Sequence, residues 1–306
     1  MTLGVRVRVP ATTANLGPGF DCLGLALDLW NEVDIRLIGN ELKISNEGEG
    51  AGILPANAKN AIFRAMKALA DQKDIPLPAG IQITSRNAIP LGSGLGSSAA
   101  AVLAGIFSAG SLFDVKLSFQ EQLDLAAELE GHPDNVAPCL LGGLTACMQT
   151  EHGVVVRSLP LKEMPILIAL PDFNFSTRVA RSVLPKLVPY KDAVFNISHT
   201  LMVTQALQEG DFDLLKEAMQ DRLHQPYRLP LIPGAQQAME AAYRAGAATV
   251  ALSGAGPALL VVCRYTEDRE TVAGVMRTQF EQAGLAMRYF LPGIAFKGVE
   301  TKIIHE

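Results

Sequence analysis

The chain has 306 residues, of which 49% are hydrophobic and 19% charged, so it can bury a large core and is long for one domain. Its 26 basic and 31 acidic residues give a formal charge of -5 without any block of five like charges, which argues against a nucleic-acid partner. No apolar run reaches the ~18 residues of a membrane span, so we predict a soluble, cytoplasmic protein without a membrane partner.

The first third of the sequence alternates between strand and helix patterns. Residues 5–10 (VRVRVP) alternate apolar and charged side chains and predict a short strand, after which Thr, Asn, Gly and Pro indicate a loop. A second strand is predicted at residues 31–38. A helix is predicted over residues 60–72, because Ile62, Met66 and Leu69 recur at helical spacing.

Two more helices are predicted in the middle of the chain. Residues 80–90 alternate as a strand, a loop of small residues follows, and residues 97–113 form a long apolar helix pattern. Ser118, with Glu121 three positions later, is typical of a capping box at the start of the next helix, and Gly131 is placed to end it.

The second half mixes helix and strand patterns without an internal repeat. Residues 159–173 contain a buried strand pattern bounded by prolines, and two further strands are predicted at residues 248–254 and 257–264. Helical patterns lie between them. We therefore expect an α+β protein of two domains, residues 1–160 and residues 161–306.

The four cysteines predict no cysteine chemistry. Cys22, Cys139, Cys147 and Cys263 form no C-x-x-C pair and have no histidines at zinc spacing. Each lies in an apolar stretch of sequence. We expect buried thiols in a reducing compartment, and neither disulfides nor a metal site.

Residues 90–100 (PLGSGLGSSAA) carry almost only small or rigid side chains, so their backbone can approach a ligand closely. The following helix begins with unpaired N–H groups and a partial positive charge, which suit an anion and above all a phosphate. The P-loop pattern is excluded, because no lysine lies between Lys73 and Lys116. The G-x-G-x-G spacing of residues 92–96 also excludes the Rossmann pattern.

A structural alternative for this loop is tight helix packing at the glycines, with Ser97 or Ser98 as a helix cap. Yet all eleven positions resemble the second signature of the GHMP kinases, the family named for galactokinase, homoserine kinase, mevalonate kinase and phosphomevalonate kinase. In that family the loop wraps the triphosphate of ATP, and its second serine, here Ser98, helps to hold Mg²⁺. The resemblance implies a nucleotide site formed by Pro90, Leu91, Gly92, Ser93, Gly94, Leu95, Gly96, Ser97, Ser98, Ala99 and Ala100.

Two further motifs extend the resemblance to nearly the whole chain. Residues 10–24 (PATTANLGPGFDCLG) resemble the first motif of the family in the form seen in its homoserine kinases. Residues 252–260 (LSGAGPALL) resemble the third motif, with Ala255 at a position usually held by Ser or Ala. The resemblance implies a two-domain fold, N-terminal ribosomal S5 domain 2-like and C-terminal ferredoxin-like, with ATP between the domains. Asn60, at the start of the helix predicted over residues 60–72, is a candidate adenine contact.

Glu128 and Glu130 precede Gly131 in the last turn of a predicted helix, where the helix dipole disfavours a carboxylate unless a cation is near. Residues two apart point about 200° apart, so only one of them can face a given ligand, and two solvated glutamates are the alternative. Mg²⁺ usually takes one or two oxygen ligands from a protein. By resemblance to homoserine kinases, the Mg²⁺ ligands are Ser98 and the first glutamate, Glu128.

The next segment, residues 131–143, holds a polar cluster of His132, Asp134 and Asn135 between a helix end and an apolar stretch. A well-bonded turn is the alternative, because Pro-Asp-Asn is also turn chemistry. The segment strongly resembles that of homoserine kinases. This implies that Asp134 and Asn135 act at the reacting hydroxyl, with Asp134 as a base or as a positioning group, and that His132 lies at the acceptor.

An amino-acid acceptor presents a carboxylate, which suits a guanidinium, and an ammonium, which suits carboxylate or amide oxygens. Arg178, Arg181 and Arg228 are candidates for the first role, although a single arginine is most often a surface residue. By the same resemblance, Arg181 and Arg228 grip the carboxylate, and Asn15 and Asp21 bind the ammonium. The full acceptor site that it implies is Asn15, Asp21, His132, Thr177, Arg181, Arg228 and Gly254.

The resemblance implies a Mg²⁺-dependent kinase that uses ATP to convert L-homoserine into O-phospho-L-homoserine, a step towards threonine. Mevalonate kinases pair their catalytic aspartate with a lysine of the first motif, and no lysine occurs here before Lys43, which argues against mevalonate. Two alternatives stay open: another GHMP kinase acting on mevalonate or a sugar, and a nucleotide-binding regulator without transfer activity. The family also allows a homodimer, which the sequence does not reveal.

Overall fold

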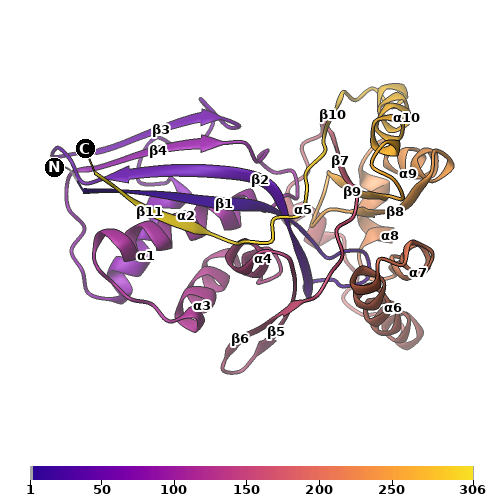
Figure 1. Ribbon diagram of the computed structural model, residues 1–306, viewed down its shortest axis with the longest axis horizontal. Helices are drawn as coiled ribbons and strands as arrows, with labels where there is room; N and C mark the ends of the chain where they lie inside the picture. The colour runs from indigo at the N-terminus through magenta and orange to yellow at the C-terminus, as the bar shows by residue number, and fades with distance from the viewer. Residues whose placement is uncertain (1–2, 306) are drawn as a thin grey trace.

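Residues 3–305 are described by the computed structural model, and they form two β-sheets that follow one another along the long axis of the molecule (Figure 1). The first sheet has the order β11-β1-β2-β4-β3, and β5 extends it by pairing with β2 and β6. Only β3 and β4 run parallel, and α1 connects them. The strands are β1 (Leu3–Ala14), β2 (Leu23–Arg36), β3 (Leu42–Gly48), β4 (Ile81–Asn87), β5 (Leu144–Thr150), β6 (Gly153–Leu159) and β11 (Glu300–His305).

The two faces of the first sheet differ because β1 alternates apolar and charged residues. Val5 and Val7 are 0% exposed and pack into the core, whereas Arg6 points to the other face. There Arg6 donates to Asp34 at 2.7 Å, and Arg86 donates to the same carboxylate at 3.2 Å. The hydrogen bonds from these guanidinium groups lower the pKa of Asp34. A charged ladder therefore forms the outer face, and the helices gather on the inner one (Figure 1).

Four helices cover the inner face, with α2 in their centre. They are α1 (Ala61–Gln72), α2 (Ser97–Leu112), α3 (Phe119–Glu130) and α4 (Val136–Leu141). Helix α2 is apolar on all sides and packs against α1, α3, α4 and β1, as expected for a buried helix. Gly105 lets α1 approach, because a Cβ there would lie 2.3 Å from the carbonyl oxygen of Ile62. This packing fixes the N-terminus of α2 near the end of β1.

The second sheet has the order β10-β7-β9-β8, and all neighbouring strands are antiparallel. Across the sheet from β10 to β8, these strands are the fourth, first, third and second of the sheet in chain order. This order confirms the predicted ferredoxin-like arrangement. Five α-helices and a 3-10 turn connect the first two strands, and one helix connects the last two. The elements are β7 (Ile166–Pro171), α5 (Thr177–Ser182), α6 (Tyr190–Glu209), α7 (Phe212–Ala218), α8 (Gln225–Arg228), η1 (Leu229–Leu231), α9 (Ala235–Arg244), β8 (Ala247–Leu252), β9 (Leu259–Cys263), α10 (Asp268–Gln282) and β10 (Met287–Phe290).

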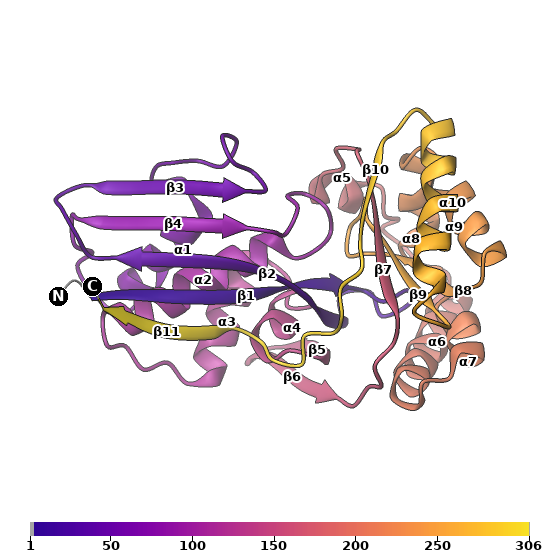
Figure 2. The ribbon, with the colours of Figure 1, turned by 45° about the horizontal axis from the view of Figure 1, so that its top comes forward.

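The chain passes from the first sheet to the second between β6 and β7, and the division into residues 1–160 and 161–306 stays a prediction. The last strand, β11, returns to the first sheet and pairs with β1. Both ends of the described chain therefore lie together at one end of the molecule (Figure 2). Such a pairing fills the open edge of β1, and no local pattern in the sequence reveals it.

Several local predictions are confirmed. The helix predicted over residues 60–72 is α1, and Asn60 caps it by accepting a hydrogen bond from the amide of Ile62. Ser118 and Glu121 form both halves of the predicted capping box of α3, and Gly131 ends that helix with φ 84°. Within residues 3–305, no helix combines the length and the apolarity needed to cross a membrane.

The cysteines are free thiols, and three of the four are buried. Burial raises the pKa of Cys263 to about 11 and raises those of Cys139 and Cys147 further. Cys22 is exposed, so the prediction of a buried thiol is wrong there. It lies in the turn between β1 and β2, where the apolar sequence around it belongs to the strand that follows.

Candidate active site

The glycine loop between β4 and α2 touches the loop that follows β8, so it joins the two halves of the molecule. A Cβ on Gly94 would lie 2.2 Å from the carbonyl oxygen of Ser253, and one on Gly96 would lie 2.0 Å from Thr12 Oγ1. Both glycines also have positive φ, 83° and 72°. Only glycine fits these positions, so the composition of the loop follows from its close contacts.

The loop turns its carbonyl groups into the protein and leaves its amides unpaired. The carbonyl oxygens of Ser93 and Gly94 accept hydrogen bonds from the Ala258 amide at 3.1 Å and the Ser253 hydroxyl at 2.8 Å. Among the described residues, the amides of residues 94–98 have no hydrogen-bond partner. These amides and the positive end of the α2 dipole together are suited to bind an anion.

A cleft of about 130 Å³ opens beside these residues, and its lining comes from distant parts of the chain. Most of the predicted site residues line it, and three residues that were not predicted, Glu130, Ala255 and Gly256, complete it. The predicted residues that line the cleft are Asn15, Asp21, Gly92, Ser93, Gly94, Leu95, Gly96, Ser97, Ser98, His132, Asp134, Asn135, Thr177, Arg181, Arg228 and Gly254.

Four residues of the predicted nucleotide set lie outside this cleft. Pro90 and Leu91 line a neighbouring cavity of about 590 Å³, which shares Gly92 and Ser93 with the cleft. Ala99 and Ala100 are 0% exposed, and their side chains belong to the hydrophobic core. The motif runs on through the first turn of α2, which rotates these two side chains away from the loop. We therefore remove both alanine side chains from the site.

Asn60, the candidate adenine contact, uses its side chain to cap helix α1. It is 3% exposed, its Nδ2 donates to the carbonyl oxygen of Pro55 at 2.9 Å, and its Oδ1 accepts from the Ile62 amide at 3.0 Å. Because the side chain caps α1 with both of its polar ends engaged, we withdraw it as an adenine contact.

The structure places Glu130, and not Glu128, against Ser98. The Ser98 hydroxyl donates to Glu130 Oε1 at 2.6 Å, across the start of α2 and the end of α3. Glu128 is exposed and lines a different cavity, because a step of two residues turns the side chain by about 200°. Burial raises the pKa of Glu130, so a nearby cation would stabilise its ionised form.

The sequence does contain a signal for Glu130. It follows the buried residues Leu123 and Ala126 of α3 at spacings of seven and four, which put all three on one helix face. Glu128 does not share that face. The apolar periodicity of α3 therefore identifies the inward glutamate, whereas the resemblance selected the first of the two.

The loop after α3 brings His132, Asp134 and Asn135 to the cleft. His132 Nδ1 lies 2.9 Å from Asp134 Oδ1, which is an ion-pair distance without the alignment of a hydrogen bond. Asp134 is 3% exposed, and its proximity raises the pKa of His132. Thr12 Oγ1 donates to Asn135 Oδ1 at 2.8 Å. The loop thus presents the buried carboxylate of Asp134 beside His132, and this carboxylate favours the charged form of the histidine.

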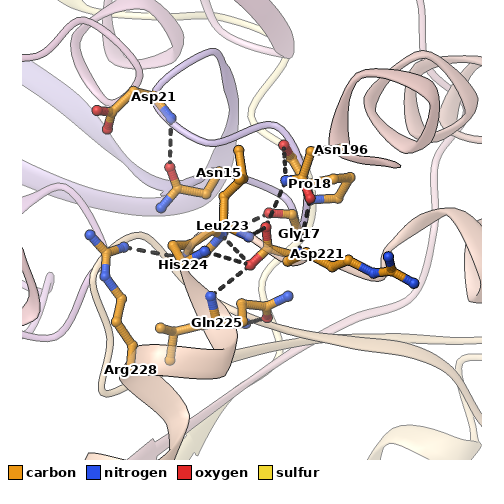
Figure 3. A network of polar contacts seen from close by, with 12 residues as sticks. Asn15, Gly17, Pro18, Asp21, Asn196, Asp221, Leu223, His224, Gln225 and Arg228 are labelled. Carbon is orange, nitrogen blue, oxygen red and sulfur yellow. Dashed lines mark hydrogen bonds and ion pairs between the residues drawn. The ribbon is translucent and has the colours of Figure 1, made fainter. Parts of the chain in front are cut away.

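The first motif forms a loop with unusual backbone geometry. Asn15 and Asp21 have φ 72° and 55°, in the left-handed region that is uncommon outside glycine and recurs at functional sites. Asn15 Oδ1 accepts from the Asp21 amide at 3.0 Å (Figure 3). Asn15 Nδ2 donates to the carbonyl oxygen of Gly254 at 2.8 Å. Asn15 therefore ties the first motif to the third.

Two arginines converge on the ring of Phe20 but differ in their partners. Arg181 approaches the ring at 5.8 Å and pairs with both carboxylate oxygens of Asp21, at 2.9 and 3.1 Å. Arg228 approaches it at 5.1 Å, is 1% exposed, and within residues 3–305 donates only to uncharged acceptors. Burial lowers the pKa of Arg228 to about 10, so it stays charged at neutral pH. A buried cation without a carboxylate partner attracts an anionic ligand.

Thr177 completes the wall near Arg181. It is the first residue of α5 and lines the cleft, while the hydroxyl of Ser176 caps the helix by accepting from the Val179 amide. Phe20, which both arginines approach, was not predicted, because an aromatic residue within the first motif gives no separate signal.

Two oxygen atoms, Ser98 Oγ and Glu130 Oε1, fit a magnesium ion that is shared with a nucleotide. The described residues hold no cluster of three or more His, Cys, Asp and Glu side chains that could bind a metal without other ligands. Mg²⁺ commonly takes one or two protein oxygens and completes its shell with water and phosphate. The partly buried Glu130 supplies the negative charge that such a site needs.

Comparisons with known proteins agree with this architecture. The family model for the GHMP kinases N terminal domain matches residues 60–143, and the model for the GHMP kinases C terminal matches residues 203–282. A homoserine kinase from Moorella thermoacetica is 44% identical over 280 residues, 91% of this chain and 93% of the relative. A homoserine kinase from Synechococcus sp. is 42% identical over 303 residues, 97% of this chain and 98% of the relative.

The similarity extends to three dimensions. The crystal structure of a homoserine kinase from Cytophaga hutchinsonii has a TM-score of 0.86 to this structure at 31% identity, and the match covers 98% of this chain and 97% of that chain. Both sheets therefore share one arrangement with that enzyme. By sequence and by fold, the chain belongs to the homoserine kinases of the GHMP kinase family.

Proposed function

We propose that the protein transfers the γ-phosphoryl group of ATP to the side-chain hydroxyl of L-homoserine and releases ADP and O-phospho-L-homoserine. Membership of the family supports the use of ATP and a role in threonine biosynthesis. The observation that carries the choice of acceptor is the convergence of Arg181 and Arg228, the second without a carboxylate partner, on the cleft beside the glycine loop.

The nucleotide end is assigned to the backbone. The unpaired amides of residues 94–98 and the N-terminus of α2 bind the phosphate groups, and the neighbouring cavity of about 590 Å³ at Pro90 and Leu91 accepts the nucleoside. Phosphoryl transfer passes through a loose transition state, so positioning and charge stabilisation are the main tasks of the protein. The loop serves both tasks, because hydrogen bonds to its carbonyl groups hold its amides in place.

Ser98 and Glu130 would hold Mg²⁺ at the nucleotide, in place of the predicted pair of Ser98 and Glu128. When bound, Mg²⁺ neutralises negative charge on the phosphate oxygens. The contribution of the protein is to hold both oxygen donors at 2.6 Å from each other and to keep Glu130 partly buried.

The acceptor end is assigned to side chains. Arg228 and Arg181 bind the α-carboxylate of homoserine through charge-assisted hydrogen bonds. Asp21, which pairs with Arg181 in this structure, turns to the α-ammonium when the carboxylate reaches Arg181. Asn15 holds the Asp21 amide and keeps that loop in place. The ligand thus replaces one protein ion pair, Arg181–Asp21, with three ion pairs of its own, to Arg228, Arg181 and Asp21.

Asp134 and Asn135 are assigned to the reacting hydroxyl. Asp134 is buried beside His132, and Asn135 is held by Thr12, so both have restricted orientations. Asp134 accepts a hydrogen bond from the hydroxyl and orients it towards the γ-phosphorus. Its carboxylate takes up the proton, or the proton passes directly to the phosphate.

An acceptor panel tests the proposed function. ADP release is measured with Mg²⁺-ATP and L-homoserine, D-homoserine, mevalonate or galactose, and we expect kcat/KM for L-homoserine to exceed the others by at least about 100-fold. A preference for mevalonate or galactose would identify a different GHMP kinase. Binding of ATP without transfer to any acceptor would identify a nucleotide-binding regulator.

A homodimer through α6 is also proposed. Tyr190, Val194, Ile197 and Leu201 of α6 are 48–86% exposed and follow one another at spacings of three and four, which is the pattern of a helix–helix seam. Leu187, which precedes the helix, is 86% exposed and extends this stripe. At roughly 150–200 Å² per large apolar residue, pairing this stripe with that of a second copy buries on the order of 600 Å² per protomer, near the lower limit of specific interfaces. Light scattering should give twice 32.6 kDa for the native chain and 32.6 kDa for Ile197→Lys; a monomeric native chain at micromolar concentration would contradict the dimer.

A further inference from the structure

The orientation of Arg228 depends on three uncharged groups. Its Nε donates to the carbonyl oxygen of Ala180 at 3.0 Å, and its Nη1 faces the carbonyl oxygen of Gly254 at 3.4 Å and His224 Nδ1 at 3.3 Å. The two carbonyl groups belong to backbone that is fixed by α5 and by the third motif. His224 is the one side chain among these three partners, and it does not line the cleft.

The contacts of His224 assign the positions of its ring protons. Its Nε2 lies 2.7 Å from the carbonyl oxygen of Gly17, and its Nδ1 faces the guanidinium of Arg228 (Figure 3). A carbonyl oxygen only accepts and a guanidinium only donates, so Nε2 carries the proton and Nδ1 offers a lone pair. His224 is therefore neutral in the Nε2–H tautomer.

The surroundings of His224 agree with a neutral ring. The side chain is 0% exposed, and its ring stacks on Phe20 with centroids 5.1 Å apart. Burial lowers its pKa, which outweighs the carboxylate of Asp221 at 3.5 Å from Nε2. Arg228 faces the ring from the other side and also disfavours a second proton.

Asp221 fixes the backbone that carries His224. Its carboxylate is fully buried and accepts hydrogen bonds from the amides of Leu223, His224 and Gln225 at 2.6–3.0 Å. Asn196 of α6 donates to the same carboxylate at 2.7 Å and to the carbonyl oxygen of Pro18 at 3.1 Å. The ring is thus held at its base by Asp221 and at its tip by Gly17.

We infer that His224 is a positioning residue for Arg228: its Nδ1 lone pair holds one edge of the guanidinium, so that the remaining N–H groups face the α-carboxylate of the acceptor. This inference rests on the proposed function and concerns how the acceptor is recognised. A histidine serves where a carboxylate would not, because a buried carboxylate at this position would neutralise the guanidinium and compete with the ligand for it.

Two substitutions separate the two contacts of the ring. In His224→Asn the side-chain oxygen is bonded to Cγ, as Nδ1 is, and it can accept from Arg228. In His224→Gln the side-chain nitrogen can reach Gly17, but no acceptor atom is bonded to Cγ at the place where Nδ1 faces Arg228. We expect the KM for L-homoserine to rise about 10–100-fold in His224→Gln and less than about 3-fold in His224→Asn, with the KM for ATP unchanged in both.

A ligand without a carboxylate supplies the control. 3-Aminopropan-1-ol keeps the hydroxyl and the ammonium of homoserine and lacks its carboxylate. Assayed as a substrate or as a competitive inhibitor against homoserine, it should bind His224→Gln and the native protein equally well, within about 2-fold. If His224→Gln lost as much affinity for 3-aminopropan-1-ol as for homoserine, the variant would have a general structural defect and the inference would be overturned.

The outcomes also separate this inference from the proposed function. A native protein that does not phosphorylate homoserine contradicts the function, whereas an active native protein with equal homoserine KM values in the two variants contradicts the role of His224. If both variants unfold, ring-nitrogen NMR of the native protein decides. An unprotonated Nδ1 at pH 7 supports the inference, and a proton on Nδ1 overturns it.

Discussion

The two ends of the cleft recognise charge in different ways. The nucleotide end consists of backbone amides in a loop where Gly94 and Gly96 leave no room for side chains, whereas the acceptor end consists of side chains, some buried and some exposed, from segments that lie far apart in sequence. A backbone site suits the triphosphate of ATP, which is the same whatever the acceptor. A site made of side chains can be specific for one acceptor, but each side chain then needs other residues to orient it, as His224 and Asp221 do for Arg228.

The largest expected effect is at the acceptor end. Replacing Arg228 with Leu removes a buried cation, so kcat/KM for L-homoserine should fall on the order of 1000-fold, while the KM for ATP changes less than about 3-fold. Steady-state kinetics with each substrate varied measure both. Arg178→Leu, an exposed residue of α5 outside the cleft, is the control and should behave like the native protein. Equal losses for ATP and homoserine would contradict the division of the cleft.

The nucleotide end should respond to a single Cβ. Gly94→Ala places a Cβ 2.2 Å from the carbonyl oxygen of Ser253, so kcat/KM for ATP should fall about 100-fold. Gly92→Ala has the same left-handed backbone problem, with φ 59°, but no atom within 4 Å of its Cβ. It should lose about 10-fold or less. Equal losses in the two variants would show that backbone strain, and not the close contact, governs the loop.

The magnesium assignment is tested by two glutamates of the same helix. Glu130→Gln should lower kcat about 10-fold and raise the Mg²⁺ concentration at half-maximal rate, because one ligand loses its charge. Glu128→Gln should leave both values unchanged, because this side chain lies in another cavity. Titration of the rate with Mg²⁺ at saturating ATP measures the pair. The reverse pattern would restore Glu128 as the ligand.

The smallest expected effect concerns stability. Asp134 raises the pKa of His132 above 6.5, the value for a free side chain. The stabilisation from this pair is complete below pH 6.5 and is lost as the pH rises through the raised pKa. As the pH rises from below 6.5 to above the raised pKa, the native protein should lose unfolding free energy relative to His132→Gln, measured with urea. If the unfolding free energies of the native protein and of His132→Gln changed in parallel with pH, the pairing of His132 with Asp134 would be contradicted.

The difference between the two ends also explains what could be predicted from the sequence. The glycine loop is contiguous, so its residues, its neighbouring helix and its anion site were predicted together. The arginines and the polar loop were predicted through resemblance to homoserine kinases, and the structure brings Arg181, Arg228 and Asp134 to one cleft. Periodicity alone does not show that such distant segments meet.

The failures have local causes. Ala99 and Ala100 belong to the motif, but the first turn of α2 directs them into the core. Glu128 was chosen by motif position, although helix periodicity favours Glu130. The return of β11 to β1 joins the two ends of the chain and leaves no local pattern. His224 and Asp221 act through contacts with other residues, so their roles become visible only with the hydrogen-bond partners in place.

The most direct test of the central claim is a crystal structure with Mg²⁺, a non-hydrolysable ATP analogue and L-homoserine. We predict that the triphosphate contacts the amides of residues 94–98 and that the α-carboxylate lies within hydrogen-bond distance of Arg228 and Arg181. A triphosphate bound away from this loop, or a homoserine carboxylate bound away from both arginines, would contradict the account.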